Sequence, residues 1–168
     1  MLIETILSNL SPDETRALHA VLVVPRGRFD PERTQCDHSG PILKLTLVSK
    51  GDKCCPLEVV VLRRDAYSTV SIFVGLGAEI FNDESIRTRG EQETIGSDLA
   101  RLLASPVQGR RWIQNRQIVK ETYTFERARM GHHPLTVTYR VNGAGLRTLF
   151  SERVAHEYEP WVRSGEKV

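Results

Sequence analysis

LKLTLVSKGDKCCPLEVVVLRRDAYSTVSIFV, residues 43–74, contains three short segments in which apolar side chains recur at about every second position. Residues 43–48 alternate leucine with other residues, residues 57–62 are rich in valine, and residues 67–74 alternate again. A period of two is typical of β-strands with one buried face. Because the links between these segments are short, we predict an antiparallel meander, with 57–62 as a central strand and a short fourth strand within residues 75–81.

The N-terminal part of the chain, residues 1–24, is predicted to be helical. Apolar residues recur at steps of three and four through residues 2–10, as in a short amphipathic helix. A second helix is predicted to begin after Ser11, because Glu14 stands three residues later, at the spacing of a capping box. Residues 25–41 contain three prolines, two glycines and alternating charges, which predict a long loop.

The middle of the chain is less regular. Residues 82–98 are polar and acidic, and we expect a loop there. A helix is predicted to begin near Ser97 and to end before Pro106, because leucines recur at helical spacing between them. The apolar residues within 112–119 indicate a helix that passes into a strand.

Two further strands are predicted from alternation at residues 121–126 and 135–141, with a turn at the Asn-Gly pair 142–143. Apolar residues within 146–161 fit the stripe of a C-terminal helix, which we favour. The alternative is that residues 146–150 form the return strand of a hairpin.

These elements predict one α+β domain over residues 1–168, in which residues 42–168 hold a sheet and its later helices. We expect a mainly antiparallel sheet of about five to six strands. The N-terminal helices, a middle helix and a C-terminal helix are expected to pack on it.

Composition narrows the class of protein. The net charge is only +2, but arginine outnumbers lysine by 18 to 5. The N-terminus lacks the basic start and apolar run of a secretory signal, and no stretch reaches the ~18 apolar residues of a membrane span. Three cysteines cannot all pair with one another, which favours a reducing compartment. We therefore expect a cytoplasmic protein without a membrane partner, of unknown oligomeric state.

No familiar catalytic or cofactor motif is present in the sequence. Several cysteines and histidines have soft donor atoms, but their spacing fits no known zinc arrangement. They are Cys36, His38, Cys54, Cys55, His132 and His133. We expect no metal, no cofactor and no catalytic residue, although the sequence does not decide whether these side chains converge.

Charge is distributed unevenly along the chain. Residues 106–140 contain seven arginines and lysines against two glutamates, whereas residues 75–105 contain six acidic against three basic residues. The basic segment also contains Trp112, Tyr123 and Phe125, rings on which nucleic-acid bases can stack. Zones of opposite sign are also suited to recognition of a charged protein.

Three functions follow, in the order in which we favour them. The first is a non-enzymatic protein-binding module, such as a small cytosolic inhibitor, immunity-type protein or adaptor, because arginine and tryptophan are enriched at binding hot spots. The second is RNA or single-stranded DNA binding through the segment 106–140, and the third is an enzyme whose site forms only in the fold. The predicted binding residues are Arg110, Arg111, Trp112, Arg116, Arg127 and Arg129.

Overall fold

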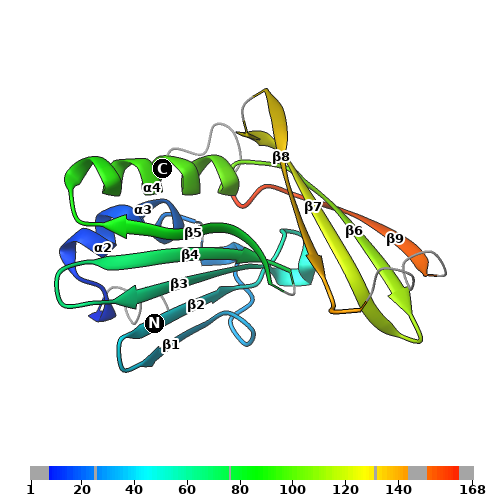
Figure 1. The fold of residues 1–168 in the computed structure, drawn as a ribbon, viewed down its shortest axis with the longest axis horizontal. Helices are drawn as coiled ribbons and strands as arrows, with labels where there is room; N and C mark the ends of the chain where they lie inside the picture. Colours follow the sequence, from blue (N-terminus) through cyan, green and yellow to red (C-terminus); the bar gives the residue numbers. More distant parts are fainter. Residues whose placement is uncertain (1–7, 25, 76, 131, 144–150, 163–168) are drawn as a thin grey trace.

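The computed structural model describes residues 8–24, 26–75, 77–130, 132–143 and 151–162, with only the backbone described for residues 26, 81–84, 129 and 130. In these residues the chain forms two antiparallel sheets and three α-helices (Figure 1). This is the predicted α+β class, with more strands than the sequence indicated and with the strands divided between two sheets.

The first sheet is a five-stranded meander in the order β1-β2-β3-β4-β5. Its strands are β1 (Gln35–Ser39), β2 (Ile42–Leu47), β3 (Leu57–Arg63), β4 (Ser68–Val74) and β5 (Ala78–Ile86). The three strands predicted from residues 43–74 are confirmed, and β3 lies at the centre of the sheet. Alternate side chains of β2, β3 and β4 are fully buried, because one face of the sheet packs against the helices.

The N-terminal helix start at Ser11 is confirmed. Helix α2 (Pro12–Ala17) is capped by Ser11, which makes a complete capping box with Glu14, and α3 (His19–Leu22) follows after a break at Leu18. Most of the helix predicted within residues 2–10 lies outside the described residues.

The predicted loop 25–41 is only partly a loop, because it contains β1 and a short 3₁₀ turn, η1 (Arg26–Arg28). Strand β1 lies at the sheet edge and its side chains are mostly exposed, so it lacks the apolar alternation that predicts a strand.

The prediction of a loop over residues 82–98 is wrong. Strand β5 continues to Ile86, and helix α4 (Arg89–Leu103) begins two turns before Ser97. Its start is fixed by a second capping box, between Thr88 and Glu91. The first half of the helix buries only Gln92 and Ile95, so its apolar stripe is too sparse to detect among exposed polar residues.

The second sheet has four strands in the order β8-β7-β6-β9. They are β6 (Val107–Gln114), β7 (Gln117–Met130), β8 (His133–Arg140) and β9 (Glu152–Tyr158). The helix predicted near Trp112 is therefore strand β6, and the predicted C-terminal helix is strand β9 where the chain is described. The return strand proposed for residues 146–150 lies outside the described residues.

Strand β9 pairs with β6, whose residues lie about 40 to 50 positions earlier in the chain, and not with β8, the strand that precedes it in the sequence. In this register Val154, His156 and Tyr158 turn to the same face of the sheet, with Tyr158 buried. The same apolar residues also fit a helical stripe, so only the long-range partner strand distinguishes the two conformations.

The hydrophobic core is continuous between the two sheets. Helix α4 packs against both β5 and β7, and Tyr123 and Phe125 of β7 are buried in the same cluster as Leu99 and Leu103 of α4. The second sheet extends beyond α4 and the first sheet at one end of the molecule (Figure 1). The part of the second sheet farthest from α4 is therefore not covered by α4 or by the first sheet.

The two-residue turn between β6 and β7 stores backbone strain at Arg116. Asn115 and Arg116 have φ of 51° and 62°, the left-handed values of a type I′ turn. Asparagine tolerates this region, but a longer side chain costs ~1–2 kcal/mol there. We expect Arg116→Gly to stabilise the protein by about 1 kcal/mol, raising Tm by about 2–4 °C in a scanning calorimetry measurement.

Arg116→Ala is the matched control, because it removes the same charge but retains the Cβ. If Arg116→Gly melts no higher than Arg116→Ala, the turn is not strained as the dihedral angles indicate.

Candidate nucleic-acid interface

Alternation along the second sheet separates its side chains into two faces. On β7, Glu121, Tyr123 and Phe125 are buried, so the residues between them point to the opposite side. We call that side the outer face. By register it consists of Gln108, Arg110, Trp112, Lys120, Thr122, Thr124, Thr136, Thr138, Arg140, Arg153, Ala155 and Glu157.

One row of residues crosses all four strands of the outer face. Arg140 of β8 is opposite Lys120 of β7, Lys120 is opposite Trp112 of β6, and Trp112 is opposite Arg153 of β9. Lys120 Nζ lies 4.2 Å from the centroid of the indole ring, and Arg153 Cζ lies 5.3 Å from it. We call these four residues the cationic row; Arg110 adds a fourth positive charge in the neighbouring row.

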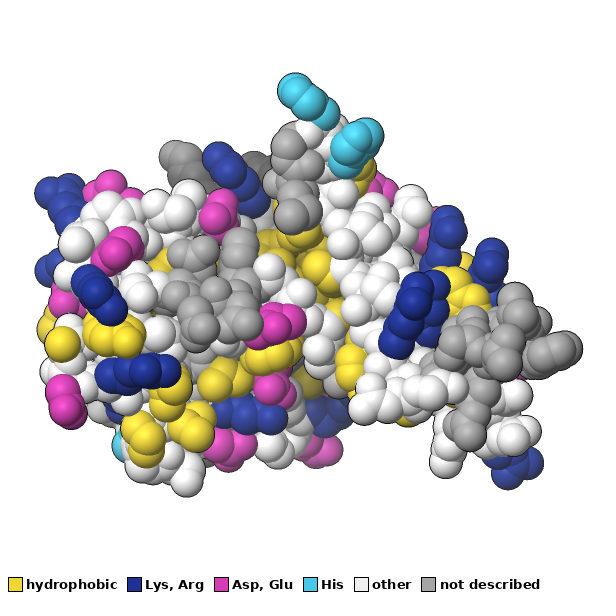
Figure 2. Space-filling view, in the orientation of Figure 1, with side chains coloured by type: hydrophobic (Ala, Val, Ile, Leu, Met, Phe, Trp, Pro, Cys, Tyr) yellow, Lys and Arg dark blue, Asp and Glu magenta, His cyan; other side chains and the backbone are white. Residues whose placement is uncertain are grey.

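The cations of this cluster, Arg110, Lys120, Arg140 and Arg153, lie near one another, and the described residues form no ion pair with them. Partial burial lowers the pKa of Lys120, and the charges of Arg140 and Arg153 lower it further. Figure 2 shows Lys and Arg side chains gathered at this end of the second sheet. The local potential is therefore positive.

Threonine pairs occupy the next two rows of the outer face. The Oγ1 atoms of Thr122 and Thr138 lie 3.2 Å apart, and those of Thr124 and Thr136 lie 3.1 Å apart. Each hydroxyl keeps further hydrogen-bonding capacity, because a hydroxyl has one donor and two acceptor positions. The surface beside the cationic row can thus donate and accept hydrogen bonds.

The six predicted binding residues do not form one site. Arg110 and Trp112 are on the outer face, and Arg116 is exposed at the adjacent turn between β6 and β7. Arg127 is near the end of α4, where its Nη1 donates to the carbonyl of Ala104. For Arg129, the side chain lies outside the described residues.

Arg111, also predicted as a binding residue, points to the opposite face of the sheet from Arg110 and Trp112. Its Nε donates to Glu121 Oε1 at 2.7 Å, and the hydroxyl of Tyr123 donates to the same oxygen at 2.9 Å. Glu121 and Tyr123 are both fully buried. Burial, and then the charge of Glu121, raise the pKa of Tyr123 well above its usual range.

The sequence did not indicate three members of the cluster as binding residues, namely Lys120, Arg140 and Arg153. Lys120 and Arg140 belong to the basic segment 106–140. The sequence does not show that strand pairing places them on the same face as Trp112. Arg153 could not be found in this way, because the segment around it was expected to be helical.

The cysteines and histidines do not form a metal site in the part of the chain that the structure describes. Burial raises the pKa of all three thiols, those of Cys36, Cys54 and Cys55, which disfavours the thiolate that nucleophilic chemistry requires. The hollow that Glu126 lines contains neither His132 nor His133 among its described lining residues.

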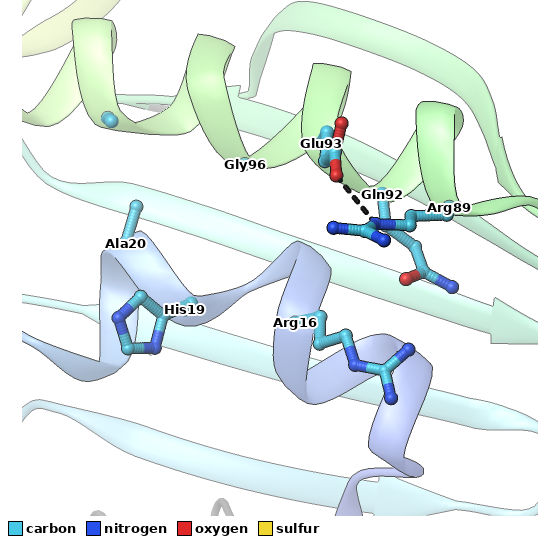
Figure 3. A pocket seen from close by; sticks show the side chains of 8 residues that line it. Arg16, His19, Ala20, Arg89, Gln92, Glu93 and Gly96 are labelled. Carbon is cyan, nitrogen blue, oxygen red and sulfur yellow. Dashed lines mark hydrogen bonds and ion pairs between the residues drawn. The ribbon is translucent and has the colours of Figure 1, made fainter.

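A second surface feature is the groove between α2–α3 and α4, about 610 Å³ in volume (Figure 3). Arg16, His19 and Ala20 lie on one side, and Gly96 on the other. Arg89 and Glu93 on its α4 side pair with each other at 2.9 Å, so these two charges offset one another. Arg16 is likewise paired with Asp13, so the arginines that line the groove have carboxylate partners. The described lining residues do not form a cluster of catalytic groups.

Comparisons with protein-family models, with curated proteins and with solved structures found no match for this chain. Within the described residues, no helix combines the length and the apolar character needed to cross a membrane.

Proposed function

We propose that this protein binds single-stranded nucleic acid, RNA or DNA, through the outer face of its second sheet. The observation that carries the proposal is the cluster of Arg110, Lys120, Arg140 and Arg153 around Trp112, with no salt bridge to any of the four among the described residues. Phosphates are bound mainly by such cations, and an aromatic ring provides a stacking surface for a base.

The composition of this face favours nucleic acid over protein. The centre of a protein–protein interface is usually apolar and depleted in charge. Among the described residues that the register places on the outer face, Trp112 is the only large apolar one, and it is surrounded by cations and hydroxyls. The hypothesis of a protein-binding module therefore takes second place, and it stays a prediction.

The cations over the indole ring do not prevent stacking. A cation–π contact at an exposed site contributes only about 0.5–1 kcal/mol. A phosphate offers these flexible side chains a full opposite charge, so Lys120 and Arg153 can turn towards the backbone of the ligand while a base takes their place on the ring. A base can reach the ring only if it is not already stacked in a duplex, which favours a single strand.

Removing three of the cations is expected to abolish most of the binding. Oligouridine and oligothymidine would be titrated into the wild-type protein and into Arg110→Ala/Arg140→Ala/Arg153→Ala at several salt concentrations, with a duplex for comparison. If all four cations contact phosphates, log K against log salt has a slope of about −2.8 for the wild type and about −0.7 for the triple variant. Trp112 fluorescence should be quenched on binding, whereas Trp161 is buried against Phe29.

The matched control is Arg33→Ala/Arg89→Ala/Arg101→Ala, which removes three exposed arginines from surface ion pairs elsewhere. It should retain the wild-type affinity and slope. An equal loss in both triple variants, or no saturable binding by the wild type, would contradict the proposal.

A further inference from the structure

The outer face carries opposite charges at its two ends. Gln108 and Glu157 are paired on β6 and β9, in the row of the outer face next to that of Arg110 and Ala155. Gln108 Nε2 donates to Glu126 Oε1 at 3.3 Å, which brings a second carboxylate to this end. Both glutamates line a surface hollow of about 340 Å³ together with Glu159. We call Glu126 and Glu157 the acidic end.

The spacing keeps the two ends electrically distinct. Trp112 and Gln108 are four residues apart on β6, which corresponds to ~13 Å along an extended strand. This exceeds the Debye length of ~10 Å at 0.1 M salt, so the exposed carboxylates do not neutralise the cationic row. They do repel a phosphate placed next to them, because two like charges ~4 Å apart repel even in water.

The cationic row, in contrast, runs across the strands. It extends from β8 to β9, a width of ~14 Å for three inter-strand spacings. A phosphate backbone that follows this row meets three cations and remains distant from both glutamates. A backbone that runs along the strands would cross the row of Thr122 and Thr138 and would then reach the next row, which contains Glu157.

We infer that the ligand is a short single-stranded segment that crosses the β-strands along the cationic row, and that Glu126 and Glu157 are specificity-determining residues that exclude phosphates from the rest of the face. This inference rests on the proposed function. The chemical class is a single-stranded segment of a few nucleotides with one base stacked on Trp112. The two glutamates act on the ligand by repulsion alone.

The test is a length series of oligonucleotides of about 3–16 nucleotides, titrated at ~0.1 M salt into the wild type and into Glu126→Gln/Glu157→Gln. For the wild type, the affinity should rise with length and then level off once the cationic row is spanned. The double variant should match the wild type for the shortest ligands and bind the longest about fivefold more tightly, because the repulsion is removed. Circular dichroism would confirm that both proteins are folded.

Asp37→Asn/Asp65→Asn is the charge-matched control, with the same change in net charge at two exposed positions, one in β1 and one in the turn between β3 and β4. A gain for the control equal to that of the glutamate variant would overturn the inference, because the effect would then be one of overall charge. Wild-type affinity that rises with length without levelling off would overturn it too, while the proposed function would stand. Absence of binding at every length would instead overturn the proposed function.

Discussion

Arg111→Ala is expected to destabilise the protein by about 3–5 kcal/mol, because it leaves a fully buried carboxylate without its counter-charge. Glu121 has 0% exposure and accepts from both Arg111 and Tyr123 through the same oxygen. The site is also tightly packed: a Cβ on Gly75, whose φ is +62°, would collide with the Tyr123 hydroxyl. The surroundings therefore have little room to admit water to this carboxylate when Arg111 is removed.

Urea unfolding followed by circular dichroism measures this loss, and Arg110→Ala provides a matched control. The two arginines are adjacent on β6 but point to opposite faces, and Arg110 is exposed. Arg110→Ala should change the free energy of unfolding by less than about 0.5 kcal/mol while weakening nucleic-acid binding. Equal stability of the two variants would show that the Arg111–Glu121 pair does not hold the sheet.

The double variant Arg111→Met/Glu121→Gln tests the cause of the loss. It removes both charges and leaves an oxygen that can accept from Tyr123. It should recover part of the stability lost in Arg111→Ala, since the penalty arises from a buried negative charge that has lost its arginine and not from the missing arginine contacts.

Arg63→Ala is expected to cost a similar amount, about 3–5 kcal/mol at neutral pH, and to change how stability depends on pH. Arg63 Nη2 lies 2.8 Å from Glu14 Oε2, and Ser68 Oγ donates to Glu14 Oε1 at 2.8 Å. Glu14 is 1% exposed and also completes the capping box with Ser11. This pair joins helix α2 to the end of strand β3.

The direction of the pH effect follows from the pKa of Glu14. Burial raises this pKa, but hydrogen bonds from Arg63, the Ser11 amide and Ser68 together bring it below its usual value. A lowered pKa means that the folded wild type gains stability from the ionised carboxylate at pH values above the unfolded pKa of ~4.3 and loses it as the pH falls through the folded pKa.

In Arg63→Ala, burial still raises the pKa of Glu14, but the hydrogen bond from Arg63 that lowers it is gone. The variant should therefore lose stability at a higher pH than the wild type does. Urea unfolding between neutral and acid pH measures both curves. Arg16→Ala is the control, because the Arg16–Asp13 pair is exposed and contributes little. Parallel curves for the wild type and Arg63→Ala would show that the pair does not govern the titration of Glu14.

Much of the first sheet could be predicted because its signals are local. Each of β2, β3 and β4 has its own alternation of apolar residues, and Ser11 and Glu14 mark a helix start within four residues. The capping box of Thr88 and Glu91 is equally local and was available to the same reasoning. The acidic and polar residues around it are also typical of a loop, so composition conceals this helix start.

The candidate site was predictable only as a basic segment with a tryptophan. Arg110 and Arg111 are equivalent in the sequence, yet one faces solvent and the other a buried glutamate. Arg153 joins the cluster from a strand that is distant in sequence. Neither fact has a local signal.

The sequence by itself determined the α+β class, the meander at the centre of the first sheet and the presence of a basic, aromatic segment, because alternation, capping and charge are properties of neighbouring residues. The tertiary structure decided that residues 152–158 form a strand, and that Arg140, Lys120, Trp112 and Arg153 lie in one row. The physical reason is that strand pairing joins residues far apart in the chain, and its register, which no single segment encodes, decides which side chains share a face.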